Sequence, residues 1–323
     1  MSASIYKCKD EQILKELCSI FRDANPLHEL KEILFEDSLS MEDTFKAISE
    51  KFEISKKTSE FILNMKIEHF CSLNEKKIEA AYEAIISENN IFDAANELLE
   101  KQNQIYNKID ERAKEAGLYR DGDLEPIYDG VYYKDAKKYL NSKMRIMWVL
   151  KEPYDDEYDD GEPCGGGWNY FDCFEPSQSP WKIRTWKNMI YTTYGILNNM
   201  QYEEMEIIED NPEMADVLLE IACINLSKMP GHTTTDSSLL PVYYGTWKDI
   251  LKQQIDLYSP QVIIFGNTFE YFKEDLFSGE TLEPVDNITQ VYKKNGVKYI
   301  DAYHPQCRIK RETYVNSIIN SVL

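Results

Sequence analysis

The chain has 323 residues, of which 43% are hydrophobic and 12% aromatic, a composition typical of proteins that fold around apolar cores. Its formal net charge is −21, and both residues 1–140 (20 basic, 29 acidic) and residues 141–323 (16 basic, 28 acidic) are acidic. An acidic chain lacks the basic surface on which non-specific nucleic-acid binding depends. No apolar run approaches the roughly 18 residues of a membrane helix, and no signal-peptide pattern opens the sequence. We therefore expect a cytoplasmic protein that does not contact membranes.

The seven cysteines and four histidines do not follow a metal-binding or disulfide pattern. The cysteines are scattered, odd in number and never paired as CxxC, which predicts reduced thiols. The histidines lie far apart in the chain and do not have the spacing of zinc ligands. We expect neither a bound metal nor a cofactor.

The first 118 residues are predicted to be entirely helical, and we assign residues 1–120 to a helical domain. Apolar residues recur at helical spacing in segments 11–21, 27–35, 41–52 and 57–70. Ser40 and Ser55 have the type and position of helix N-caps. Residues 74–115 contain neither proline nor glycine and predict one or two long helices. Their apolar seam comprises Ile78, Tyr82, Ile85, Ala95, Leu98, Ile105 and Ile109.

Residues 45–85 contain a segment, AISEKFEISKKTSEFILNMKIEHFCSLNEKKIEAAYEAI, that resembles the exit-gate dimer contact of DNA gyrase and topoisomerase IV A subunits. The resemblance implies a homodimer formed through residues of about 40–115, or a surface that meets such a protein. An ordinary helical bundle is the alternative. The matching positions include Phe61, Ile62, Leu63, Met65, Ile67, Leu73, Lys77, Ile78, Glu79 and Tyr82.

Glycine, aspartate and proline gather in GLYRDGDLEPIYDG, residues 117–130, and predict a linker over residues 121–139. From residue 140 the pattern changes. Short apolar runs at 145–150, 218–226, 261–266 and 298–304 alternate with helical patterns at 183–197, 243–258 and 312–323. Strands that alternate with helices predict an α/β domain with a mainly parallel central sheet over residues 140–323.

Each of the four predicted strands is followed by a polar residue or a glycine. Glu152 follows the first strand, Asn225 ends the second, Gly266-Asn267 follow the third and His304 follows the fourth. Because ligands bind at the carboxyl ends of parallel strands, these residues are candidates for one site. The alternative for Glu152, in RIMWVLKEPY, is a solvated loop acid.

Six motifs in this region, in order, resemble those of the uracil-DNA glycosylase superfamily over residues 140–323. LKEPYD (150–155) matches the family's G-Q-D-P-Y-H at Pro153 and Tyr154, with Glu152 at the aspartate. The others are GEPCGGGWNYF (161–171), RTWKNMIYTTY (184–194), CINL (223–226), IIFGNTF (263–269) and HPQCR (304–308). The resemblance implies a three-layer α/β fold and a DNA-repair hydrolase that releases uracil or a related base.

The resemblance also implies roles that fit the chemistry of the residues. Glu152 would activate water or stabilise the sugar cation, and His304 would stabilise the leaving base. Asn225 would read the base edge. Phe171 would stack on the base, with Tyr154 and Trp168 beside it. Apart from the resemblance, the basic cluster RIKR (308–311) offers Arg308 as a phosphate contact, with a solvated helix start as the alternative. The substrate would be DNA, with single strands favoured because the duplex-probing leucine is missing, or a free base or nucleotide.

Each of these residues also has a structural interpretation. Asn225 and His304 are residue types that cap strand ends and turns, and Trp168 and Phe171 are suited to a core. The acidic run after Tyr154, residues 155–162, is a poor neighbour for a phosphate backbone. A non-catalytic module that binds a base, a nucleotide or a protein is therefore the alternative function.

Overall fold

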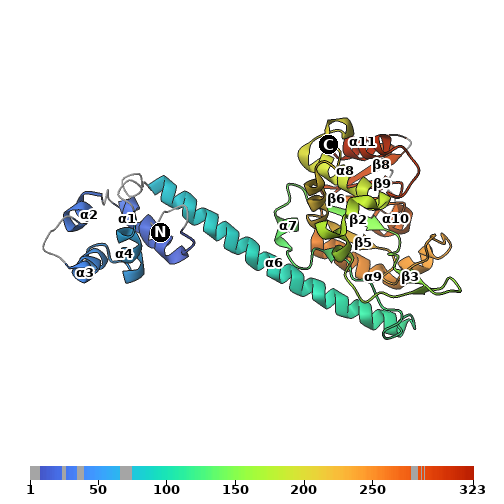
Figure 1. Cartoon of the computed structure of the whole chain (residues 1–323), viewed down its shortest axis with the longest axis horizontal. Helices are drawn as coiled ribbons and strands as arrows, with labels where there is room; N and C mark the ends of the chain where they lie inside the picture. Colours follow the sequence, from blue (N-terminus) through green and yellow to red (C-terminus); the bar gives the residue numbers. More distant parts are fainter. Residues whose placement is uncertain are drawn as a thin grey trace. The chain divides into compact units, whose positions relative to one another are not determined.

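The computed structural model describes residues 8–23, 27–34, 40–65, 75–277, 283–284, 286 and 288–323 (Figure 1). The chain divides into two compact units, residues 1–93 and 94–323. The boundary falls inside helix α6 (Glu75–Glu115) and not at the expected linker. Residues 121–139 differ from a free linker, since Ile127, Asp129 and Val131 are fully buried within the second unit.

The first unit is helical in the part of it that the structure describes, as predicted. It contains α1 (Glu11–Asp23), α2 (Leu27–Leu34), α3 (Met41–Phe52), α4 (Lys56–Leu63) and the start of α6. Ser40 and Ser55 cap α3 and α4 by accepting the backbone N–H groups of Asp43 and Thr58. Ile67 and Leu73 of the gyrase-like segment lie outside the described residues.

The second unit is built on a seven-stranded sheet in the order β1-β5-β2-β6-β9-β8-β7. The four central strands are parallel, while the outer strands pair antiparallel with their neighbours. The prediction of a mainly parallel central sheet is confirmed, and each expected apolar run contains one strand. The strands are β1 (Gly130–Val131), β2 (Ile146–Leu150), β5 (Ala222–Asn225), β6 (Val262–Gly266), β7 (Glu283–Pro284), β8 (Thr289–Lys294) and β9 (Val297–Ala302).

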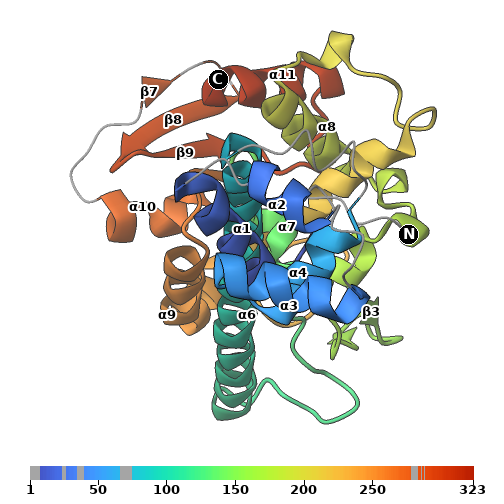
Figure 2. The same cartoon turned by 90° about the vertical axis from the view of Figure 1, so that its left-hand side faces the viewer.

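Helices cover both faces of this sheet (Figure 2). Because side chains alternate along a strand, Ile146, Trp148 and Leu150 of β2 pack on the side of α8 (Arg184–Asn198) and α11 (Arg311–Val322). Met147 and Val149 pack on the side of α9 (Leu240–Tyr258), α10 (Phe269–Phe277) and residues 95–113 of α6. A strand buried on both faces explains the uninterrupted apolar run.

Smaller elements join these layers. The bounds of the short helix and the hairpin strands are α7 (Lys137–Leu140), β3 (Asp156–Glu157) and β4 (Pro163–Cys164). The 3₁₀ segments are η2 (Tyr170–Phe174), η3 (Pro176–Gln178), η4 (Pro180–Lys182), η5 (Tyr202–Glu204) and η6 (Pro212–Leu219). Among the described residues, no helix combines the length and apolarity needed to cross a lipid bilayer.

Candidate functional site

A pocket of about 720 Å³ opens at the carboxyl ends of β2, β5 and β9. Across the sheet the four parallel strands lie in the order β5-β2-β6-β9. The chain goes from β2 to β5 on one side and then to β6 and β9 on the other, so the strand order reverses beside β2. Such a reversal is where open α/β sheets bind ligands. Five of the predicted site residues line the pocket: Glu152, Tyr154, Trp168, Asn225 and His304.

Glu152 follows β2 and holds a carboxylate partly out of water. Its Oε2 atom is buried and has no hydrogen-bond partner among the described residues. Burial raises the pKa of Glu152, against the opposing effects of a hydrogen bond from Thr235 and the nearby charges of Lys151 and His232. A buried polar atom without a partner is costly, and the residue that carries this one lines the pocket.

His304 follows β9 and is held as a neutral imidazole. The backbone N–H of Gln306 donates to its Nδ1 at 3.1 Å, so the ring proton is assigned to Nε2. Burial, helped by the charge of Lys151, lowers the pKa of His304 to about 4. At neutral pH the ring therefore carries one N–H donor and no charge.

Asn225, the last residue of β5, is 1% exposed. Its backbone N–H and its Nδ2 both donate to Oδ2 of Asp129, at 2.7 and 3.2 Å. Its Oδ1 is buried and has no hydrogen-bond partner in the described part of the chain. Two residues of the pocket lining thus carry buried acceptor atoms for which the described residues offer no donor, Glu152 Oε2 and Asn225 Oδ1.

Aromatic rings form one wall of the pocket. Trp168 and Tyr170 are nearly parallel, with an interplanar angle of 12° and ring centroids 6.4 Å apart. The indole Nε1 of Trp168 and the backbone N–H of Gly166 both donate to Oδ2 of Asp155, at 2.8 and 2.7 Å. Gly166 has φ +90°, and a Cβ there would overlap the backbone of Glu125, so this turn requires glycine.

The acidic run forms part of the pocket's loops. Besides the contacts of Asp155, Glu157 accepts the backbone N–H of Thr233 at 2.6 Å. The carbonyl of Gly161 contacts Nδ1 of His232 at 3.0 Å. These contacts tie the β3–β4 hairpin to residues 231–235, whose Thr233 and Thr235 line the pocket. At least two of these acids therefore have a structural role.

Two predicted site residues lie elsewhere. Phe171 is fully buried in the core beside Phe174 and does not line the pocket, so its expected stacking role is not available to it. The neighbouring Tyr170 occupies the wall instead. Arg308 is exposed and outside the lining. Asn267, from the third strand end, lines a separate pocket of about 220 Å³.

Two residues that support the site were not singled out by the sequence. Asp129 and Lys228 form a buried ion pair 99 residues apart in the chain, and neither has a local signal. Asn188 of α8 donates to the carbonyl of Pro305 at 2.6 Å and accepts from Arg311. Asn188 belongs to the motif RTWKNMIYTTY (184–194) of the family resemblance, and its amide holds the segment containing His304 in place.

Comparison with known proteins finds no matching family model and no matching curated protein. Among the described residues, no group of three or more histidine, cysteine, aspartate or glutamate side chains is arranged to hold a metal ion.

Proposed function

We propose that residues 94–323 are an N-glycosylase, similar to the uracil-DNA glycosylase superfamily, which hydrolyses the bond between a sugar and uracil or a related base. One observation carries the proposal. Glu152 and Asn225 line the same pocket as the neutral His304, and each carries a buried oxygen, Oε2 or Oδ1, without a donor among the described residues.

The three side chains match the charges that develop during this reaction. The sugar becomes cationic as its bond to the base breaks, and the ionised carboxylate of Glu152 stabilises that cation. Water then bonds to the sugar carbon, and Glu152 takes the proton that the water loses. The base leaves with the electron pair of the broken bond, and the Nε2–H of His304 stabilises the resulting anion.

The size and walls of the pocket support a base that is still attached to its sugar. A volume of about 720 Å³ lies within the roughly 300–1,000 Å³ typical of ligand sites. The rings of Trp168 and Tyr170 offer a surface for stacking, as enzymes that act on an extruded base require. A single strand is the favoured form of DNA because its base does not have to leave a duplex.

Incubation with single-stranded oligonucleotides containing uracil, followed by alkali, tests this proposal. We expect strand scission at the uracil, and its loss in Glu152→Gln. Glu162→Gln is the matched control, because Glu162 is an exposed acid on the nearby hairpin outside the pocket lining. No scission at enzyme excess, or equal scission by Glu152→Gln, contradicts the proposal.

The acidity of the pocket's surroundings favours a second candidate, a module that binds a free base or nucleotide without cleaving it. Six of the eight residues from Asp155 to Glu162 are acidic, and such a hairpin repels a phosphate backbone more than a small ligand. Thermal-shift measurements with uracil, nucleosides and nucleotides separate the candidates. Stabilisation by a ligand that is recovered intact supports binding alone.

A further inference from the structure

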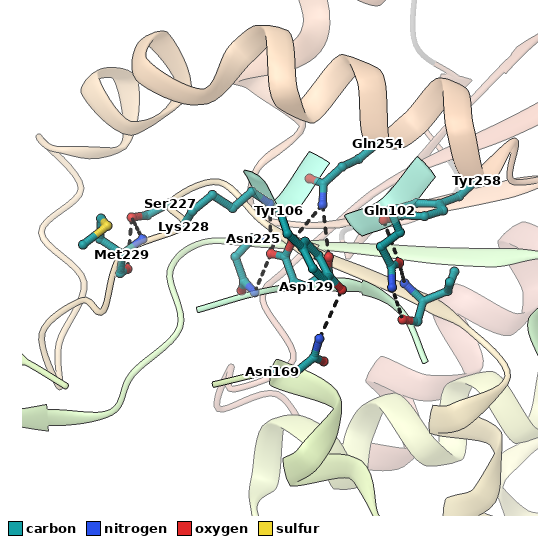
Figure 3. A network of polar contacts seen from close by, with 11 residues as sticks. Gln102, Tyr106, Asp129, Asn169, Asn225, Ser227, Lys228, Met229, Gln254 and Tyr258 are labelled. Carbon is teal, nitrogen blue, oxygen red and sulfur yellow. Dashed lines mark hydrogen bonds and ion pairs between the residues drawn. The ribbon is translucent and has the colours of Figure 1, made fainter. Parts of the chain in front are cut away.

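Asn225, which lines the pocket, belongs to a buried polar network centred on Asp129 (Figure 3). Asp129 precedes β1, and Lys228 follows β5. Both side chains are fully buried, with the Nζ of Lys228 2.7 and 2.9 Å from the two carboxylate oxygens of Asp129. Removing an ion pair from water is expensive, so further hydrogen bonds to the pair are expected.

Two residues, Gln254 and Asn225, make these further hydrogen bonds. The carboxylate of Asp129 is the acceptor in every one of them. Gln254 of α9 donates from Nε2 to Oδ1 of Asp129 at 2.8 Å. Asn225 donates to Oδ2 twice, from its backbone N–H and from Nδ2. Together with Lys228, these donors surround the carboxylate of Asp129. An ionised carboxylate has no proton to give, so it can only accept.

This arrangement fixes which way the Asn225 amide points. If the amide turned over, the lone pairs of Oδ1 would face the carboxylate of Asp129, and one hydrogen bond would become a repulsion. The bonded orientation directs Nδ2 toward Asp129 and leaves Oδ1 as the buried acceptor without a donor in the described part of the chain. A ligand that meets Oδ1 must therefore bring an N–H or O–H group.

The segment that carries Asp129 is itself held firmly. The side-chain amide of Gln102, in α6, bonds to both the N–H and the carbonyl of Val131 in the edge strand β1. The hydroxyl of Tyr258 donates to the same Gln102 amide at 2.9 Å. Gly130, at φ +146°, leaves the space that Tyr258 and Gln102 occupy.

We propose that Asp129, held in place by Lys228, is a positioning residue that locks the Asn225 amide and thereby restricts the pocket to bases that donate a ring N–H to Asn225 Oδ1. The inference rests on the proposed function and adds the origin of its selectivity. A uracil-type ring offers an N–H at this edge. A cytosine-type ring offers a lone pair there, which would face the oxygen of Asn225.

The test replaces both members of the ion pair, Asp129→Asn with Lys228→Met, because removing one alone leaves an uncompensated buried charge. The new amide can donate as well as accept, so the Asn225 amide is free to turn over. We expect the ratio of uracil to cytosine release from matched single-stranded oligonucleotides to fall roughly 10- to 100-fold. Gln254→Met is the matched control, because it removes a donor to Asp129 without touching Asn225.

An unchanged ratio in a folded double variant overturns the inference. Should the double variant not fold, Asp129→Asn alone is measured in its place, because it makes the same change from carboxylate to amide beside Asn225, at the cost of leaving Lys228 without its partner. Folding is checked by circular dichroism and thermal melting of the full chain.

An NMR measurement on the protein without a nucleobase or DNA separates this inference from the proposed function. The side-chain amide signal of Asn225 in a ¹⁵N–¹H spectrum, assigned by its absence in Asn225→Asp, should shift in the double variant and not in Gln254→Met. An unmoved signal overturns the locking of the amide. A shifted signal in a protein that releases no base contradicts the glycosylase proposal but leaves the locking of the amide intact.

Discussion

At the scale of single residues, the pocket keeps a carboxylate in surroundings that disfavour its charge. Glu152 Oε2 is buried, lacks a partner among the described residues and has a raised pKa because of its burial. Such a group destabilises the folded state whenever it is ionised. Active sites commonly hold groups of this kind, which stabilise the reaction at the expense of the fold.

Glu152→Gln should therefore stabilise the protein at neutral pH. Because the folded pKa is raised, stability is lost as pH rises from the ordinary glutamate pKa of 4.5 to the folded pKa, whereas near pH 4 the carboxyl is largely protonated in both states. We expect a melting temperature higher by about 2–4 °C at pH 7–8, corresponding to about 1 kcal/mol. The gain should vanish near pH 4, and thermal melts at both pH values check this. An equal rise in melting temperature at pH 4 and at pH 7–8 contradicts the interpretation that ionised Glu152 destabilises the fold.

Lys151 should tune both ionisable groups of the pocket. Its positive charge lowers the pKa of Glu152 and that of His304. Lys151→Met should raise both values, because the ammonium no longer stabilises the carboxylate or disfavours the imidazolium. The rate of base release, measured as a function of pH, should then begin to rise at a higher pH than in the wild type. A rise that begins at the same pH, or at a lower pH, argues against this role.

At the scale of elements, the site depends on loops that approach each other closely after the strands end. Gly231, whose backbone N–H donates to the carbonyl of Pro153, lies against Glu152. A Cβ at Gly231 would overlap Cγ of Glu152. At Gly266, a Cβ would lie 3.0 Å from Leu150 and 3.1 Å from Pro305. Gly231 lets the segment after β5 approach the end of β2, and Gly266 lets the ends of β2, β6 and β9 lie near one another.

Gly231→Ala should displace Glu152 and reduce base release toward the level of Glu152→Gln. Overpacking of this kind costs about 1–3 kcal/mol, so the fold should survive in a stable domain. Gly245→Ala in α9 is the matched control, because a Cβ there meets nothing within 4 Å and replaces a helical glycine. Activity assays and melting curves on both variants check the prediction. Full activity in a folded Gly231→Ala protein would show that Glu152 is not positioned by this contact.

At the scale of the whole molecule, helix α6 contributes to two separate cores. Ile78 and Ile85 belong to the core of residues 1–93, while Ala95, Leu98 and Ile109 belong to the core of the second unit. The apolar seam read from the sequence is therefore one helix that serves two units. The proposed homodimer through residues of about 40–115 rests on the gyrase-like pattern alone.

Light scattering on the full chain tests that proposal. We expect a mass of twice 37.8 kDa that persists on dilution. A mass of one chain at every concentration contradicts a dimer and favours an ordinary helical bundle. Because the pocket lies within residues 94–323, base release should not depend on the outcome.

The sequence by itself determined the helical first unit, the parallel strands and three of the strand-end residues of the pocket. Apolar periodicity and position after a strand are local properties, so Glu152, Asn225 and His304 could be chosen before their distances were known. The same reasoning proposed Phe171 as the stacking residue, whereas the structure places Phe171 in the core and Tyr170 on the pocket wall. An aromatic after a glycine loop can face the pocket or the core, and the choice depends on packing.

Only the tertiary structure decided what the strand-end residues can do. Asp129 and Lys228 meet across 99 residues, and nothing local in either segment indicates that their pairing would orient an amide. The neutrality of His304 and the orphaned oxygen of Glu152 likewise depend on burial and on contacts from distant loops. Charge state and hydrogen-bond direction are set by the surroundings of a group, and those surroundings exist only in the folded chain.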